Sequence, residues 1–83
     1  MTFPLFSRVI LTHDIREQDL MAGDMGTIVE HHPATGDHPE GYEIECFAGN
    51  GETIAVISVS ANGIRPATSQ EVLHVRQLSP AST

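Results

Sequence analysis

The chain has 83 residues with 11 acidic side chains, four arginines and no lysine, which gives a formal net charge of −7. This length suffices for one domain with one hydrophobic core, and the single cysteine excludes an internal disulfide and a cysteine-rich zinc site. Because an acidic chain repels phosphate backbones and four scattered arginines form no basic stripe, we expect no nucleic acid partner.

Residues 1–6 lack the basic region and the long apolar segment of a signal peptide. Apolar runs elsewhere are only a few residues long, which is too short to cross a bilayer. We therefore expect a cytoplasmic protein with no membrane association. One domain should cover residues 1–83, with its core between about 6 and 78 and a frayed tail at 79–83.

The first two strands are predicted at residues 7–12 and 26–31, where β-branched side chains are concentrated. A polar loop at 13–24 separates them and ends in a turn at Gly23-Asp24, because glycine adopts the positive φ that such turns require. The next stretch, 32–41, contains two prolines and two glycines, so we expect an exposed loop.

Apolar and acidic side chains alternate along residues 42–47, which predicts a half-buried third strand. Its core face would carry Tyr42, Ile44 and Cys46, and its solvent face Glu43 and Glu45. Asn50-Gly51 favours a tight hairpin turn whose twist matches paired strands. The return strand at 53–59 is nearly apolar on both faces, so we expect it to be central or covered on its outer side.

Four features are predicted in the C-terminal third of the chain. Asn62-Gly63 predicts a turn, and a short segment at Ile64-Arg65 ends at Pro66. Residues 68–71 could form a single helical turn with Ser69 near its cap. A final strand is predicted at 72–76.

Five short strands in a chain of this size predict an all-β domain. Curling into a small barrel would remove exposed strand edges. The long loop after the first strand and the tight middle hairpin favour a five-stranded SH3-like barrel with at most one short helical turn before the last strand. An open five-stranded sheet is the alternative.

A resemblance to a known family rests on five segments, residues 6–14, 20–30, 42–47, 51–56 and 64–66. Over roughly residues 3–78 the chain resembles the bacterial proteins grouped as domain of unknown function 4926. The resemblance implies an SH3-like barrel and offers one functional lead, an antitoxin-like or immunity-like role beside a toxin gene. The histidine-rich loop from His31 to Glu40, together with Cys46, departs from the family pattern.

No catalytic constellation stands out, and we expect no enzyme activity. A thiol nucleophile needs a base within hydrogen-bond reach and an activating environment, but Cys46 is assigned to the core face. Glu43 and Glu45 share a strand face, yet nothing apolar surrounds them to raise a pKa, so they are interpreted as solvated side chains.

Side chains of metal-ligand type gather in one loop: His31, His32, Asp37, His38 and Glu40. Imidazole and carboxylate groups together can hold zinc, nickel or copper. The loop could fold back and bring His31 and His38 together, which makes these two the candidate ligands. Their spacing matches no recognised motif, so we predict no resident metal or cofactor.

The first functional hypothesis is a protein-binding module with a basic protein partner, because the chain is strongly acidic. The predicted partner-binding residues are Asp14, Glu17, Asp19, Asp24, Glu43 and Glu45. The second is a structural subunit or homo-oligomer that pairs through an edge strand, and the third is a metal-responsive loop.

Overall fold

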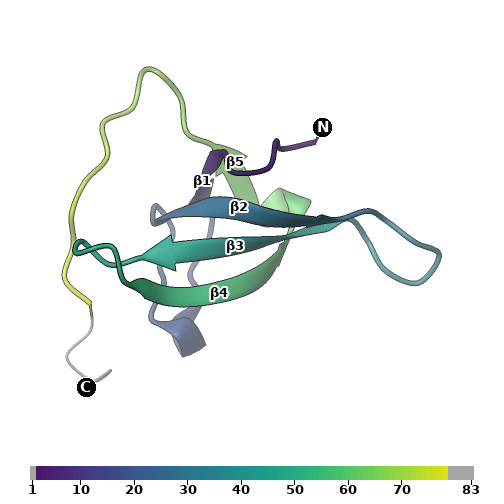
Figure 1. The fold of residues 1–83 in the computed structure, drawn as a ribbon, viewed down its shortest axis with the longest axis horizontal. Coiled ribbons are helices and arrows are strands. Elements are labelled where there is room, and N and C mark those ends of the chain that lie inside the picture. The colour runs from purple at the N-terminus through teal and green to yellow at the C-terminus, as the bar shows by residue number, and fades with distance from the viewer. Residues whose placement is uncertain (1, 79–83) are drawn as a thin grey trace.

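Five strands form one antiparallel sheet in the order β4-β3-β2-β1-β5 (Figure 1). The computed structural model describes residues 2–78, so the tail predicted at 79–83 lies outside the described residues. The strands are β1 (Arg8–Leu11), β2 (Met25–His32), β3 (Gly41–Phe47), β4 (Thr53–Ser60) and β5 (Ile64–Pro66). Two 3₁₀ turns, η1 (Arg16–Gln18) and η2 (Ala61–Gly63), are the helical elements of residues 2–78. The all-β prediction is confirmed.

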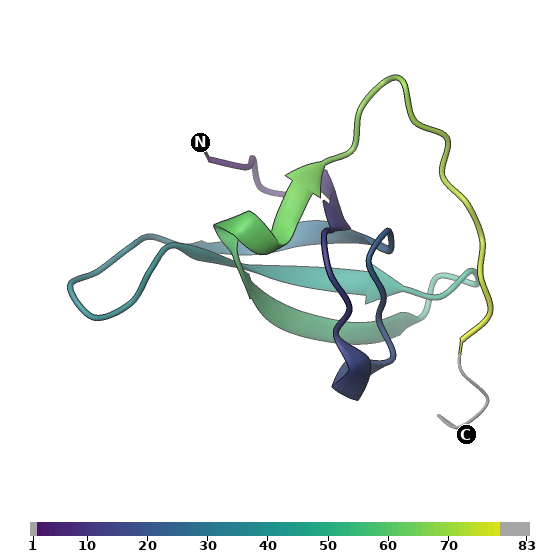
Figure 2. The same ribbon diagram turned by 180° about the vertical axis from the view of Figure 1, so that it is seen from behind.

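The sheet coils, because its two edge strands are consecutive in the chain. β4 and β5 lie at opposite edges of the ladder, yet only η2 (Ala61–Gly63) separates them. Such a short connection requires the sheet to curve, and Figures 1 and 2 show β1 and β5 running across the direction of β2, β3 and β4. Within residues 2–78 the strand pairing runs from β4 to β5 without closing between them, so barrel closure stays a prediction.

The hydrophobic core lies on the concave side of this sheet. Strand alternation brings one face of β1, β2 and β3 onto it, and Tyr42, Ile44 and Cys46 are buried as predicted. The remaining core members are Phe3, Val9, Leu11, Leu20, Ile28, Ile57, Val59 and Ile64. Phe3 comes from the segment before β1, and its ring meets the Tyr42 ring edge-on with centroids 5.2 Å apart.

A β-bulge interrupts the pairing of β2 with β3. Ile28 pairs with Ile44, but the next pair is Glu30 with Glu43, so Val29 is one residue in excess. Beyond the bulge, His31 pairs with Tyr42 and turns toward it, and the two rings stack with centroids 4.8 Å apart. The same shift places Glu30 on the outer face of the sheet.

The hairpin between β3 and β4 lies where the sequence predicts it, but its turn type differs. The turn runs from Ala48 to Gly51 and is closed by the Gly51 N–H donating to the Ala48 carbonyl, and Asn50 does not have the positive φ of a two-residue Asn-Gly turn. Gly51 has φ +90°, a conformation that favours glycine. The Asn50 side chain accepts a hydrogen bond from the backbone N–H of Glu52, and Ala48 N–H donates to the Glu52 carbonyl. The β2–β3 connection is exposed along 33–39, also as predicted.

The predicted position of β4 was wrong. Among the described residues 2–78, β4 (Thr53–Ser60) is an edge strand that pairs with β3 alone, and Val56 is 54% exposed. Its apolar composition on both faces suggested a central strand. That pattern arises here because Ile57 and Val59 enter the core while Val56 faces solvent.

Two of the C-terminal predictions were wrong, the final strand at 72–76 and the helical turn at 68–71. The predicted turn at Asn62-Gly63 lies in η2, and the short segment that ends at Pro66 is β5. β5 takes the place beside β1, through pairs such as Leu11 with Ile64, so the predicted strand at 72–76 has no place beside β1 and none of these residues is in a strand. Val75 in that segment is 95% exposed. Residues 68–71 form a hydrogen-bonded turn rather than a helical one, with the Glu71 N–H donating to the Thr68 carbonyl.

No helix within residues 2–78 combines the length and apolar composition that spanning a bilayer requires.

The Tyr42 hydroxyl holds the segment before β1 in place, and substitution of Tyr42 tests this contact. It accepts a 3.0 Å hydrogen bond from the backbone N–H of Phe3 in the buried core. Tyr42→Phe keeps the ring packing but leaves this N–H without its acceptor, so the free energy of unfolding should fall by about 1 kcal/mol. Urea unfolding followed by circular dichroism measures the change. Tyr42→Ala, which also empties the ring site, should cost about 3–5 kcal/mol. Equal stability of wild type and Tyr42→Phe would contradict this role.

Candidate functional site

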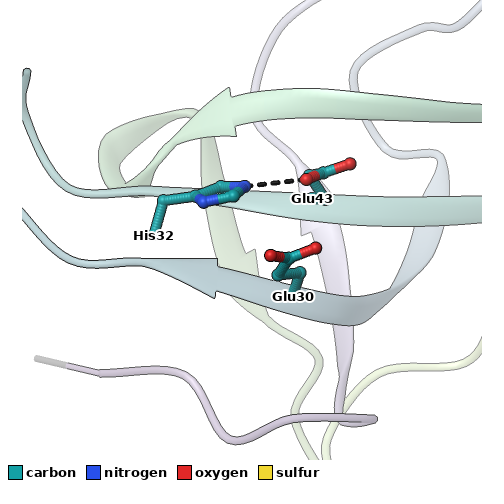
Figure 3. A group of neighbouring side chains, drawn as sticks. All are labelled: Glu30, His32 and Glu43. Carbon is teal, nitrogen blue, oxygen red and sulfur yellow. Dashed lines mark hydrogen bonds and ion pairs between the residues drawn. The ribbon is translucent and has the colours of Figure 1, made fainter.

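Three side chains of metal-ligand type converge on the outer face of the β2–β3 hairpin (Figure 3). They are Glu30 and His32 on β2 and Glu43 on β3, and one ligand atom from each lies within 4.8 Å of the others. The His32 Nε2 atom is 2.7 Å from a carboxylate oxygen of Glu43. Within residues 2–78, it is the one group of three or more candidate ligands whose ligand atoms lie this close together.

The bulge at Val29 is what assembles this cluster. Without an extra residue, strict alternation from the inward Ile28 would turn Glu30 toward the core. With it, Glu30 lies directly opposite Glu43, and His32 follows two residues later on the same face. The two carboxylates are therefore cross-strand neighbours, a like-charged arrangement that is unfavourable by itself.

The outer face of β3 carries a second carboxylate, that of Glu45. Glu45 lies two residues beyond Glu43 and accepts a hydrogen bond from the Thr53 hydroxyl. Its partner across the β3–β4 ladder is the exposed Val56. Carboxylates therefore lie beside an apolar, uncharged edge strand.

The two histidines predicted as metal ligands are placed apart from this cluster. His31 stacks on Tyr42, and its Nε2 atom lies 2.7 Å from a Glu40 oxygen. His38 is exposed in the β2–β3 loop, where it lines a hollow of about 620 Å³ together with His32 rather than with His31. Neither belongs to a group of three candidate ligands within residues 2–78.

Four of the predicted partner-binding residues lie in the loop between β1 and β2, and three of them, Asp14, Asp19 and Asp24, accept hydrogen bonds that hold this loop in place. The Asp14 carboxylate accepts a 2.9 Å hydrogen bond from the Ala22 N–H. The Asp19 carbonyl accepts one from Arg76, and Asp19 itself has a left-handed backbone with φ 57°. Glu17 is exposed on η1.

Asp24 holds the most extensive of these contacts. Arg76 donates from Nε and Nη2 to its two oxygens at 2.9 and 2.6 Å, and the Met21 N–H donates to it at 2.9 Å. Burial works against ionisation, but the hydrogen bonds from Arg76 and Met21 outweigh it, so the pKa of Asp24 lies below its ordinary value. This clamp fixes the segment 67–78 against the loop, with a hollow of about 710 Å³ between segment and sheet.

The Asp24 clamp predicts a pH-dependent loss of stability. Asp24→Asn removes the charge, and the free energy of unfolding at pH 7 should fall by about 1–2 kcal/mol. Because the pKa is lowered in the folded state, the contribution is complete above the ordinary aspartate value and is lost as pH falls through the folded value. The difference between wild type and Asp24→Asn should therefore shrink below about pH 4.

Chemical denaturation at several pH values measures this difference. Asp37→Asn, an exposed aspartate of the β2–β3 loop, is the matched control and should leave stability unchanged. A gap between wild type and Asp24→Asn that stays constant down to pH 2.5 would contradict the clamp.

Cys46 is confirmed as a buried thiol. It is 2% exposed, and burial, with smaller contributions from the charges of Asp24 and Glu45, raises its pKa to about 11. The thiolate needed for nucleophilic attack is therefore scarce at neutral pH.

Native protein at pH 8 should react with Ellman's reagent at least about 100-fold more slowly than protein unfolded in urea, because each pKa unit reduces the thiolate fraction tenfold. Absorbance of the released thiolate at several reagent concentrations measures the two rates. Equal rates would place Cys46 at the surface.

Sequence reasoning singled out two members of the outer-face cluster, but neither Glu30 nor the grouping. Glu43 was expected on the solvent face, and His32 was included with the histidine-rich loop. The grouping depends on the bulge at Val29, for which the sequence gives no turn residue or glycine as a signal.

The comparisons with known proteins identify the family of the chain. A family model described as a domain of unknown function, DUF4926, matches residues 5–66, from the segment before β1 to the end of β5. No curated protein and no solved structure matches significantly. The segment 67–78 lies beyond the matched region. Because the match covers most of the chain, this protein belongs to the DUF4926 family.

Proposed function

We propose that this domain is a non-catalytic protein-binding module that takes an extended, basic segment of its partner along β4. The observation that carries the proposal is an eight-residue edge strand, Thr53–Ser60, without a charged residue or a proline. An antitoxin-like or immunity-like pairing with the product of a neighbouring gene, in the bacterial cytoplasm, is the setting that the family resemblance suggests.

The composition of β4 supports strand addition. Exposed sheet edges are commonly protected from pairing by lysines, inward charges, prolines or bulges. β4 carries none of the charges or prolines, and the register shift that it shares with β3 lies at its first residues, near Phe47 and Thr53. Within residues 2–78 no other segment pairs with its free edge. A partner strand could therefore extend the sheet through main-chain hydrogen bonds.

Charge supports a basic partner over a second copy of the chain. Each copy carries a formal charge of −7, so two copies repel. Glu43 and Glu45 lie on the strand next to β4, so basic side chains on the outer face of an added strand would lie two strand spacings, about 10 Å, from these carboxylates. At low salt this distance is within the range of electrostatic attraction. Such complementarity raises association rates and makes them depend on salt. Pairing of β4 with itself is the alternative, since the same uncharged edge would serve it.

The partner is captured from the protein's own cells, together with products of neighbouring genes, on wild type and on variants in parallel. Val56→Lys places a charge on the exposed side of β4 and should abolish capture, whereas Glu52→Lys in the nearby turn should not. With the captured partner purified, Glu45→Lys should slow association about tenfold at low salt and weaken its salt dependence.

Equal capture by wild type and Val56→Lys would exclude β4 as the binding edge, and unchanged association rates for Glu45→Lys would exclude the acidic face. Glu17→Lys tests the predicted contribution of the β1–β2 loop by the same measurement. A concentration-dependent dimer in native mass spectrometry that disappears in Val56→Lys would favour self-pairing.

A further inference from the structure

We propose that Glu30, His32 and Glu43 form a surface site for a divalent transition metal ion, with Zn²⁺ as the best fit to this donor set. The site is separate from the strand-addition edge, because it lies on β2 and β3 and not on β4. It also differs from a cluster of carboxylates alone, since the imidazole of His32 adds a nitrogen ligand that favours zinc over calcium or magnesium.

The distances between ligand atoms suit one shared ion after small side-chain rotations. Zinc bonds to nitrogen and oxygen of about 2.1 Å place tetrahedral ligands roughly 3.4 Å apart. The three ligand atoms lie within 4.8 Å of one another, and the closest pair, His32 Nε2 and a Glu43 oxygen, is 2.7 Å apart. The most widely separated pair must approach by at most about 1.4 Å and the closest pair must separate, while the ion takes the place of the hydrogen bond between His32 Nε2 and Glu43.

Electrostatics around the site favour a cation. Glu30 and Glu43 are directly opposed across the β2–β3 ladder, an arrangement of like charges that a divalent ion would relieve. Two of the four arginines are committed elsewhere, Arg65 to Glu71 and Arg76 to Asp24. Arg8 pairs with Thr27, on the part of β2 that precedes the bulge. No arginine forms an ion pair with the cluster within residues 2–78.

The backbone positions of the three ligands are fixed by strand pairing, which distinguishes this site from the loop histidines. Glu30 pairs with Glu43, and His32 pairs with Gly41, the residue that begins β3. A metal ion would therefore need to order side chains only. Three protein ligands leave at least one coordination position for water or for a group from outside the chain.

Isothermal titration calorimetry with ZnCl₂ on the full chain tests the site. One ion per chain should bind with a Kd below about 10 µM at pH 7.5. His32→Ala and Glu43→Gln should each weaken binding at least tenfold. The melting temperature of wild type should rise with added zinc, whereas that of His32→Ala should not.

Three matched variants locate the ion. Glu45→Gln lies on the same strand face outside the cluster, and His38→Ala and His74→Ala remove exposed imidazoles elsewhere, so all three should bind zinc as wild type does. Loss of binding in His38→Ala with retention in His32→Ala would overturn the proposal in favour of the loop. Binding weaker than about 100 µM, or equally strong in wild type and His32→Ala, would also overturn it. Because Glu45→Lys leaves the three ligands intact, failure of the protein-binding test and failure of the metal test are separable.

Discussion

The single extra residue at Val29 is the constraint on which both faces of the β2–β3 hairpin depend. Side chains alternate along a strand, so shifting the register by one residue exchanges the two faces for everything that follows. Inside, the shift turns His31 onto Tyr42, whose hydroxyl in turn holds the Phe3 backbone. Outside, it brings Glu30 beside Glu43. The same bulge thus packs the core and concentrates charge on the surface.

Connection length decides which C-terminal segment completes the sheet. Residues 64–66 and 72–76 both contain β-branched side chains, and the second segment is the longer candidate. η2 follows β4 directly and places Ile64 opposite Leu11 of β1. The edge beside β1 is therefore taken by residues 64–66 and is not open to residues 72–76. The later segment is then held by side chains instead, through Arg65 with Glu71 and Arg76 with Asp24. The family match also ends where the sheet ends.

The features that depend on local sequence patterns were predicted correctly. Alternation placed Tyr42, Ile44 and Cys46 in the core, and Asn50-Gly51 located the hairpin. Prediction failed where the outcome depends on pairing between distant segments. An apolar strand such as β4 looks central whether its second edge is paired or free, because composition does not show whether the backbone groups of that edge are paired. The grouping of Glu30, His32 and Glu43 is hidden for the same reason, since it depends on the pairing register.

The acidic side chains fall into two groups. Some are hydrogen-bonded within the β1–β2 loop, and others lie on the outer face of the sheet, where a partner or an ion could reach them. Asp14 and Asp24 accept hydrogen bonds from backbone groups of their own loop, and Asp24 is further neutralised by Arg76. A carboxylate already paired in this way offers little field to a partner, because its charge is compensated locally. On the outer sheet face, Glu30 and Glu43 have no arginine partner within residues 2–78. Carboxylates without an arginine partner, held on paired strands, are the part of this surface that a cation or a basic strand can use. Of the two predicted binding regions, this favours the sheet face over the loop.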